Sequence, residues 1–167
     1  IVKKHPATMF NFSAITKGLA CDEVGRTLSR CGVNDYMVEI GGELALKGLN
    51  PEGKPWRIMV DAPVTGSLPG SKGVRIIEKT DCGIATSGNY RNRRATSHGS
   101  VGHTIDPLTG RPVARGILSA TVIAPDCMTA DALATACMAM RPDSARAMIE
   151  SLPGIRSIFV LPASKKQ

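Results

Sequence analysis

The 167-residue sequence lacks the features that mark several large protein classes. Its five cysteines form no CxxC pair, and none lies near a histidine at zinc-finger spacing. The odd cysteine count argues against a full disulfide framework. No apolar run reaches the roughly 18 residues that a membrane-spanning helix needs. Aromatic residues make up only 4% of the chain, so the core must be built from aliphatic, alanine and methionine side chains.

Three familiar catalytic and nucleotide-binding motifs are also absent. The sequence holds no GxGxxG, no Walker A loop and no GxSxG nucleophile elbow, which excludes the standard dinucleotide, P-loop and serine-hydrolase readings. The net charge is +7, from 21 Lys and Arg against 14 Asp and Glu. Such an excess suits nucleic acid, an anionic membrane or a phosphate-bearing ligand. No basic helix interleaved with aromatic residues is present, so we expect no nucleic-acid partner.

Apolar periodicity and turn residues predict an α+β fold in a single domain, 1–167. The expected helices are 13–31, capped by Ser13, then 129–140 and 143–151. The expected strands are 33–40, 44–46, 56–60, 74–77, 84–88, 118–124 and 157–161, with 44–60 as one hairpin and 89–102 as a polar loop. Because hairpin strands are grouped together, we expect a mostly antiparallel sheet with helices packed on one face.

Two helices carry candidate ligand sites. Asp131 and Thr135 are four residues apart, so both side chains should lie on one helix face and offer hard oxygen ligands to Mg²⁺. Equally, Asp131 could simply complement the helix dipole. The start of the first helix, with Lys17 one turn in, could bind a pyrophosphate, or it could be an ordinary capped helix with a surface lysine.

Two loops have suitable chemistry. Gly41-Gly42-Glu43 permits close approach of a ligand to the backbone, although a β-bulge would need the same glycines. The stretch 103–113 places His103 and Asp106 three residues apart within a turn-rich loop. A histidine exchanges protons near neutral pH, and a nearby carboxylate can orient it. Taken alone, such a loop is more often structural than catalytic.

Ordered blocks of the chain resemble the ApbE flavin transferases. They are Asn11-Phe12-Ser13-Ala14-Ile15-Thr16-Lys17-Gly18, Asp22, Ile40-Gly41-Gly42-Glu43, Pro51-Glu52-Gly53-Lys54-Pro55-Trp56-Arg57-Ile58, Ala85-Thr86-Ser87-Gly88-Asn89-Tyr90, the stretch 103–113, and Thr121-Val122-Ile123-Ala124-Pro125 leading to 130–136. The blocks fall in the order of the family and cover nearly all of residues 9 to 140. The resemblance implies a T-fold-like, ApbE-like architecture.

The resemblance also implies an activity and a set of site residues. Members of this family transfer FMN from FAD to a threonine or serine hydroxyl of a target flavoprotein, require magnesium and release AMP. Mg²⁺ would be held by the backbone carbonyl of Ala14 and the side chains of Asp131 and Thr135. FAD would contact Asn11, Lys17 and Ile105. His103 would be the base, with Asp106 beside it.

By the same resemblance, the chain is expected to be the carboxy-terminal part of a protein about twice as long. That protein would be a lipoprotein on the periplasmic face of the bacterial inner membrane, attached only through a lipid anchor outside this chain. Other readings stay open: magnesium-dependent hydrolysis of FAD to FMN and AMP, a non-catalytic FAD-binding module, an inactive fragment, or an α+β fragment without a ligand.

Overall fold

The computed structural model describes residues 2–63, 71–88, 93–96, 99–102, 104–107, 109–113 and 116–162, with 93–96 and 99–102 described as backbone only. The helices are α1 (Thr16–Arg30), α2 (Cys127–Ala139) and α3 (Pro142–Glu150). The strands are β1 (Tyr36–Ile40), β2 (Glu43–Lys47), β3 (Trp56–Asp61), β4 (Gly73–Lys79), β5 (Cys82–Gly88), β6 (Arg93–Thr96), β7 (Gly99–Gly102), β8 (Ser119–Ala124) and β9 (Arg156–Val160).

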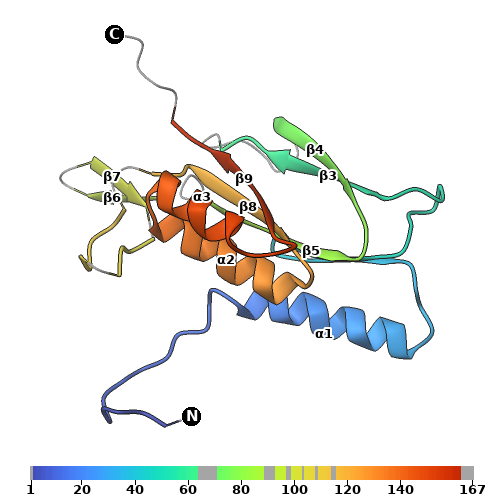
Figure 1. Cartoon of the computed structure of the whole chain (residues 1–167), viewed down its shortest axis with the longest axis horizontal. Helices are drawn as coiled ribbons and strands as arrows, with labels where there is room; N and C mark the ends of the chain where they lie inside the picture. The colour runs from blue at the N-terminus through green and yellow to red at the C-terminus, as the bar shows by residue number, and fades with distance from the viewer. Residues whose placement is uncertain are drawn as a thin grey trace.

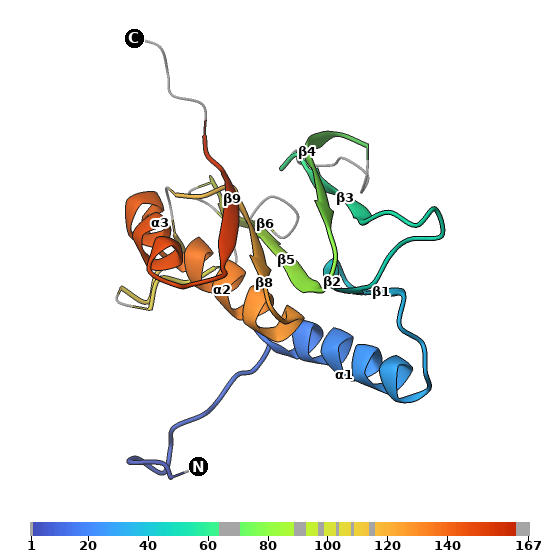
Figure 2. The same ribbon diagram turned by 45° about the vertical axis from the view of Figure 1, so that its right-hand side comes forward.

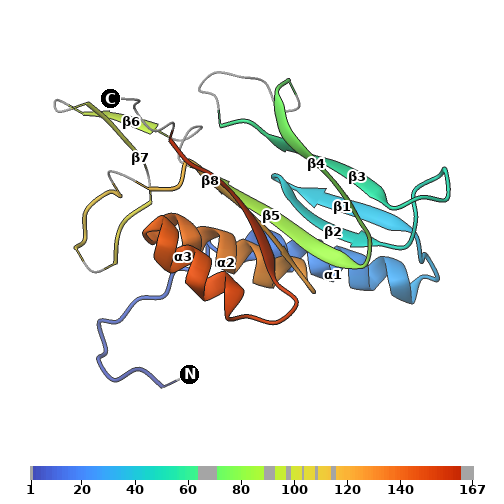
Figure 3. The same ribbon diagram turned by 45° about the horizontal axis from the view of Figure 1, so that its top comes forward.

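One antiparallel sheet organises the molecule (Figure 1), with strand order β1-β2-β5-β8-β9. Every pairing within this sheet is antiparallel, for example Leu44 opposite Ile84 and Ala85 opposite Val122. The three helices lie together on one side of the sheet (Figure 3). The predicted α+β class, with a mostly antiparallel sheet and helices on one face, is therefore confirmed.

The β3–β4 hairpin covers the opposite face near β2 (Figure 2). Leu44 and Leu46 of β2 pack with Val60 and Ile77 of this hairpin, whereas Ala45 faces Cys21 of α1 and Cys127 of α2. Strand β2 is consequently buried on both faces. A strand of this kind shows a continuous apolar run rather than alternation, as Leu44-Ala45-Leu46 does.

The predicted hairpin spanning residues 44–60 is wrong, because β2 and β3 belong to different sheets. Gly41 and Gly42 instead form a two-residue turn between β1 and β2, with φ of +63° and +100°. Glycine adopts positive φ without steric cost, and such turns match the twist of a hairpin. The two glycines therefore form the turn of a β1–β2 hairpin, whereas the sequence prediction placed a hairpin turn at residues 50–53.

Two other local predictions need correction. Helix α1 begins at Thr16, and its N-cap residue is Ile15, whose side chain makes no capping hydrogen bond. Ser13 lies in a preceding turn in which the amides of Ile15 and Thr16 both donate to the carbonyl of Phe12, and it is two residues too early to be the cap. The stretch 89–102 was predicted to be a loop, but it contains the paired strands β6 and β7.

The core on the helix side is built from small side chains. Ala120, Val122 and Ala124 of β8 pack against Ala130 and Ala134 of α2, all at most 3% exposed. Small residues on both surfaces let the helix lie close to the sheet. None of the helices in the described part of the chain is long and apolar enough to cross a membrane.

Candidate functional site

A cavity of about 870 Å³ opens where the start of α1, the turn between β1 and β2, strand β3 and the end of β5 meet. This volume is within the range of pockets that bind cofactor-sized ligands. The predicted site residues that line it are Ala14, Lys17, Ile105, Asp131 and Thr135. They come from three distant parts of the sequence and meet only in the folded chain. The hydroxyl-rich stretch Thr86-Ser87-Gly88, expected to line a pocket, also lies in this wall.

The other predicted site residues lie elsewhere. The side chain of Asn11 accepts a hydrogen bond from the amide of Ser13 at 2.9 Å and is outside the cavity wall. Asp106 is also outside the wall, in a turn where its amide donates to the carbonyl of Arg111 at 2.9 Å. His103 lies outside the described residues. The predicted roles of these three residues remain predictions.

Asp131 is a buried acid that joins the two long helices. Its side chain is 2% exposed, and Oδ2 accepts a hydrogen bond from the backbone amide of Gly18 at 3.0 Å. The contact needs glycine, because a Cβ at position 18 would lie 2.4 Å from the carbonyl oxygen of Cys127. Burial raises the pKa of Asp131, opposed by the Gly18 amide and the charge of Lys17. Burial therefore disfavours the charged form of this carboxyl, and the Gly18 amide and Lys17 favour it.

Thr135 lies one turn after Asp131 on the same face of α2, as the spacing of four residues predicted. Its hydroxyl lies 3.2 Å from Ser87 Oγ of β5. Helix and sheet therefore present neighbouring oxygen atoms to the cavity.

Glu43 is a cavity residue to which sequence reasoning gave no role. It directly follows the Gly41-Gly42 turn and is 2% exposed. Its Oε1 lies 2.6 Å from Lys17 Nζ, whereas its buried Oε2 has no hydrogen-bond partner within the described structure. Burial raises the pKa of Glu43, partly offset by Lys17, and Asp131 adds to the rise. The only sequence signal was an acid that directly follows two glycines after a predicted strand.

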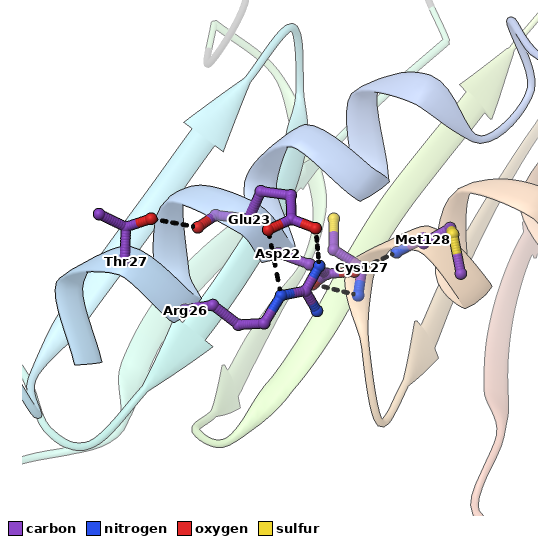
Figure 4. Close-up of polar contacts among 6 residues, drawn as sticks. All are labelled: Asp22, Glu23, Arg26, Thr27, Cys127 and Met128. Carbon is purple, nitrogen blue, oxygen red and sulfur yellow. Dashed lines mark hydrogen bonds and ion pairs between the residues drawn. The ribbon is translucent and has the colours of Figure 1, made fainter. Parts of the chain in front are cut away.

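Asp22 of α1 holds the start of α2 in place (Figure 4). Its two carboxylate oxygens accept hydrogen bonds from the amides of Cys127 and Met128, both at 2.9 Å. The true N-cap, Asp126, accepts from the amide of Thr129 at 2.7 Å. The first amides of a helix lack partners within the helix, and here two acids supply them. The position of Asp131 depends on this anchoring one turn earlier.

The electrostatic character of the cavity follows from these contacts. Glu43 and Asp131 are both buried in its wall, and Lys17 is the cation paired with one of them. Within the described residues no three His, Cys, Asp or Glu side chains form a ready-made metal cluster. The cavity instead combines the buried carboxyl groups of Glu43 and Asp131 with hydroxyl and backbone oxygen atoms, and Glu39, Asp61 and Arg57 also line it.

Comparison with solved structures gives the class to which this architecture belongs. The chain superimposes on the flavin transferase ApbE from Vibrio cholerae with a TM-score of 0.74 at 42% identity, covering 89% of this chain and 46% of that one. It superimposes on the apo flavinyl transferase ApbE of Pseudomonas stutzeri with a TM-score of 0.78 at 36% identity, covering 94% of this chain and 47% of that one. The fold is that of the flavin transferases.

The sequence model described as the ApbE family matches residues 1–159, and the chain belongs to the ApbE family. Curated relatives agree. The FAD:protein FMN transferase of Vibrio cholerae is 44% identical over 149 residues, covering 89% of this chain and 44% of the relative. That of Escherichia coli K12 is 34% identical over 147 residues, covering 88% and 41%. The chain thus spans less than half the length of these relatives.

Proposed function

We propose that this chain forms the phosphate- and metal-binding part of an FAD:protein FMN transferase. In this reaction FMN passes from FAD to a serine or threonine hydroxyl of a target flavoprotein, and AMP is released. The observation that carries the proposal is the convergence of Ala14, Lys17, Ile105, Asp131 and Thr135 on one cavity. The name shared by the curated relatives supports transfer over simple hydrolysis of FAD.

The proposed metal is Mg²⁺, held by the carbonyl oxygen of Ala14, the carboxylate of Asp131 and the hydroxyl of Thr135. Magnesium prefers oxygen ligands and usually keeps water and substrate phosphates in its shell. Burial raises the pKa of Asp131 in the cavity wall, and Oε2 of Glu43 nearby has no hydrogen-bond partner in the described structure. A bound cation would stabilise the charged form of both carboxyl groups. When bound, Mg²⁺ would neutralise charge on the pyrophosphate.

The residues of this chain would orient FAD for an in-line displacement. Lys17, the second residue of α1, supplies a positive charge for the phosphates at the cavity wall. Ile105 offers an exposed apolar contact to the flavin, and Asn11 an amide to the same ligand. The acceptor hydroxyl attacks the phosphorus of the FMN moiety, the bond to the AMP phosphate breaks, and AMP leaves.

The base in this proposal is His103, with Asp106 beside it. The hydroxyl proton would pass to the imidazole as the new P–O bond forms, which requires hydrogen-bond reach between them. The family resemblance is the support for this assignment.

The partner is a target flavoprotein with an accessible Ser or Thr hydroxyl.

We further propose that the protein acts at the periplasmic face of the inner membrane as a lipoprotein, and that residues 1–167 form the carboxy-terminal domain of the longer enzyme. Labelling of the intact protein with a radioactive lipid precursor, followed by cell fractionation, tests this placement.

The function is tested by Asp131→Asn in the full-length protein. FMN transfer is read from flavin fluorescence of the target protein in a denaturing gel, and AMP release is measured in parallel. We expect the rate of FMN transfer to fall by on the order of 100-fold, because the substitution removes a proposed metal ligand. The exposed Asp143→Asn on α3 is the matched control and should retain activity. Full transfer by Asp131→Asn would contradict the metal assignment, and AMP release without any target would indicate hydrolysis instead.

A further inference from the structure

Glu43 and Lys17 form an ion pair at the rim of the cavity that joins the β1–β2 turn to the first turn of α1. The Glu43 side chain is 2% exposed, the Lys17 side chain is 47% exposed, and their charged atoms lie 2.6 Å apart. The backbone of Glu43 is also tied to α1, because Cys21 Sγ donates to its carbonyl oxygen at 3.2 Å. The carboxylate is therefore fixed, and the lysine is the partner that would otherwise move.

The carboxylate is a poor stabiliser of the fold. One of its oxygens is buried without a hydrogen-bond partner in the described structure, and burial raises its pKa in spite of Lys17. A buried carboxylate with one unpartnered oxygen costs free energy, because that oxygen loses water without gaining a hydrogen bond. The position of Glu43 therefore calls for an explanation other than stability.

Lys17 is held in an unusual place for a cation. It occupies the second residue of α1, whose first turn holds no acidic residue, where the helix dipole disfavours positive charge. The stem of Lys17 runs over Gly41, since a Cβ built on that glycine would lie 3.1 Å from Lys17 Cδ. The turn and the acid together hold the positive charge of Lys17 at the cavity wall.

We propose that Glu43 is a positioning residue that fixes the Lys17 ammonium at the cavity before a phosphate-bearing ligand arrives. Lysine has three N–H donors, and the ion pair with Glu43 leaves others for phosphate oxygens. A lysine that is ordered beforehand loses less side-chain freedom on binding, so the ligand binds more tightly. The inference rests on the proposed function for the identity of the ligand, the pyrophosphate of FAD.

The test compares Glu43→Gln, Lys17→Met and the double variant in the full-length protein. Isothermal titration measures Kd for FAD, for ADP, which carries the pyrophosphate, and for riboflavin, which carries no phosphate. We expect Glu43→Gln to weaken FAD and ADP binding by roughly tenfold, the effect of one charge-assisted contact, and to leave riboflavin binding unchanged. In the Lys17→Met background, Glu43→Gln should have no further effect, because it acts through the lysine.

The melting temperature separates this role from a structural one. Glu43→Gln should keep or raise it, whereas a structural role predicts a fall of several degrees. Glu52→Gln is the matched control, because Glu52 pairs with Lys54 at 3.8 Å on the surface with both side chains more than two-thirds exposed.

Four outcomes would overturn the inference: unchanged ADP affinity, an additive loss in the double variant, an equal loss for riboflavin, or no ADP binding by the wild-type protein. FMN transfer to a target is measured separately. Retained transfer with unchanged affinities refutes this inference alone, whereas tight ADP binding without any transfer refutes only the proposed function.

Discussion

Replacing Asp22 with alanine should destabilise the protein strongly, because this half-buried residue of α1 holds the start of α2. The substitution removes both acceptors of the Cys127 and Met128 amides (Figure 4). Cys127 is 0% exposed, so water cannot easily replace the lost partner of its amide, whereas Met128 is 36% exposed. An unsatisfied buried donor costs about 1–3 kcal/mol, and the exposed contact adds about 1 kcal/mol. We therefore expect a loss of roughly 3 kcal/mol, equivalent to about 6–12 °C in Tm for a chain of this size.

Thermal and urea unfolding measure this loss, and Glu23→Ala provides the comparison. Glu23 is the next residue on α1 and pairs with Arg26 at 2.6 Å, but both side chains are at least half exposed. An exposed pair of this kind contributes at most about 1 kcal/mol. Asp22→Asn, which keeps one acceptor, should fall between the two. If Asp22→Ala lowers Tm no more than Glu23→Ala does, the anchoring of α2 by α1 is not what holds the helix start.

Two further predictions concern the cavity. Gly18→Ala should lower the free energy of unfolding by about 1–3 kcal/mol, because its Cβ would lie 2.4 Å from the Cys127 backbone. Gly116→Ala is the control and should be nearly neutral, because its nearest neighbours lie at 3.5 Å or more. Urea unfolding compares the two variants. Glu43→Gln should become more stable relative to wild type as pH rises. The folded pKa of Glu43 lies above its unfolded value, so its favourable contribution is complete below about pH 4 and is lost as pH rises through the folded pKa. Tm measured from pH 4 to 8 tests this, and a difference that does not change with pH would disprove it.

The sequence predicted the fold class because that class depends on local patterns. The helix 129–140 and the strand 118–124 were found within two residues of α2 and β8, since apolar runs and Pro125 mark their ends. The pairing of strands was less accessible. The turn at residues 50–53 predicted a hairpin between β2 and β3. Instead, β3 leaves the sheet and pairs with β4. Trp56 Nε1 of β3 still contacts β2, because it donates to the carbonyl of Lys47 at 3.0 Å. Turn chemistry cannot show which layer a strand will join.

The candidate site divides in the same way. Helical spacing predicted that Asp131 and Thr135 share one face of a helix, the family resemblance singled them out as metal ligands, and the two residues do line one cavity. The buried state of Glu43 could not be predicted, because its contacts with Lys17 and Cys21 of α1 exist only in the folded chain. Likewise, nothing in the local sequence shows that Gly18 donates to Asp131. Contacts between distant segments decide which polar residues become functional candidates.

The joint between α1 and α2 also has a consequence for how the chain folds. The Gly18–Asp131 and Asp22–Cys127 contacts span 113 and 105 residues of sequence. Closing loops of this length is slow compared with forming a helix or a hairpin. During synthesis α1 leaves the ribosome long before α2 has been made, so the groups of α1 that later bond to α2 are hydrated until then. We therefore expect the cavity to form late in folding. Separation of α1 from α2 would break both contacts, so hydrogen exchange at the amides of Gly18 and Cys127 measures how often the cavity opens.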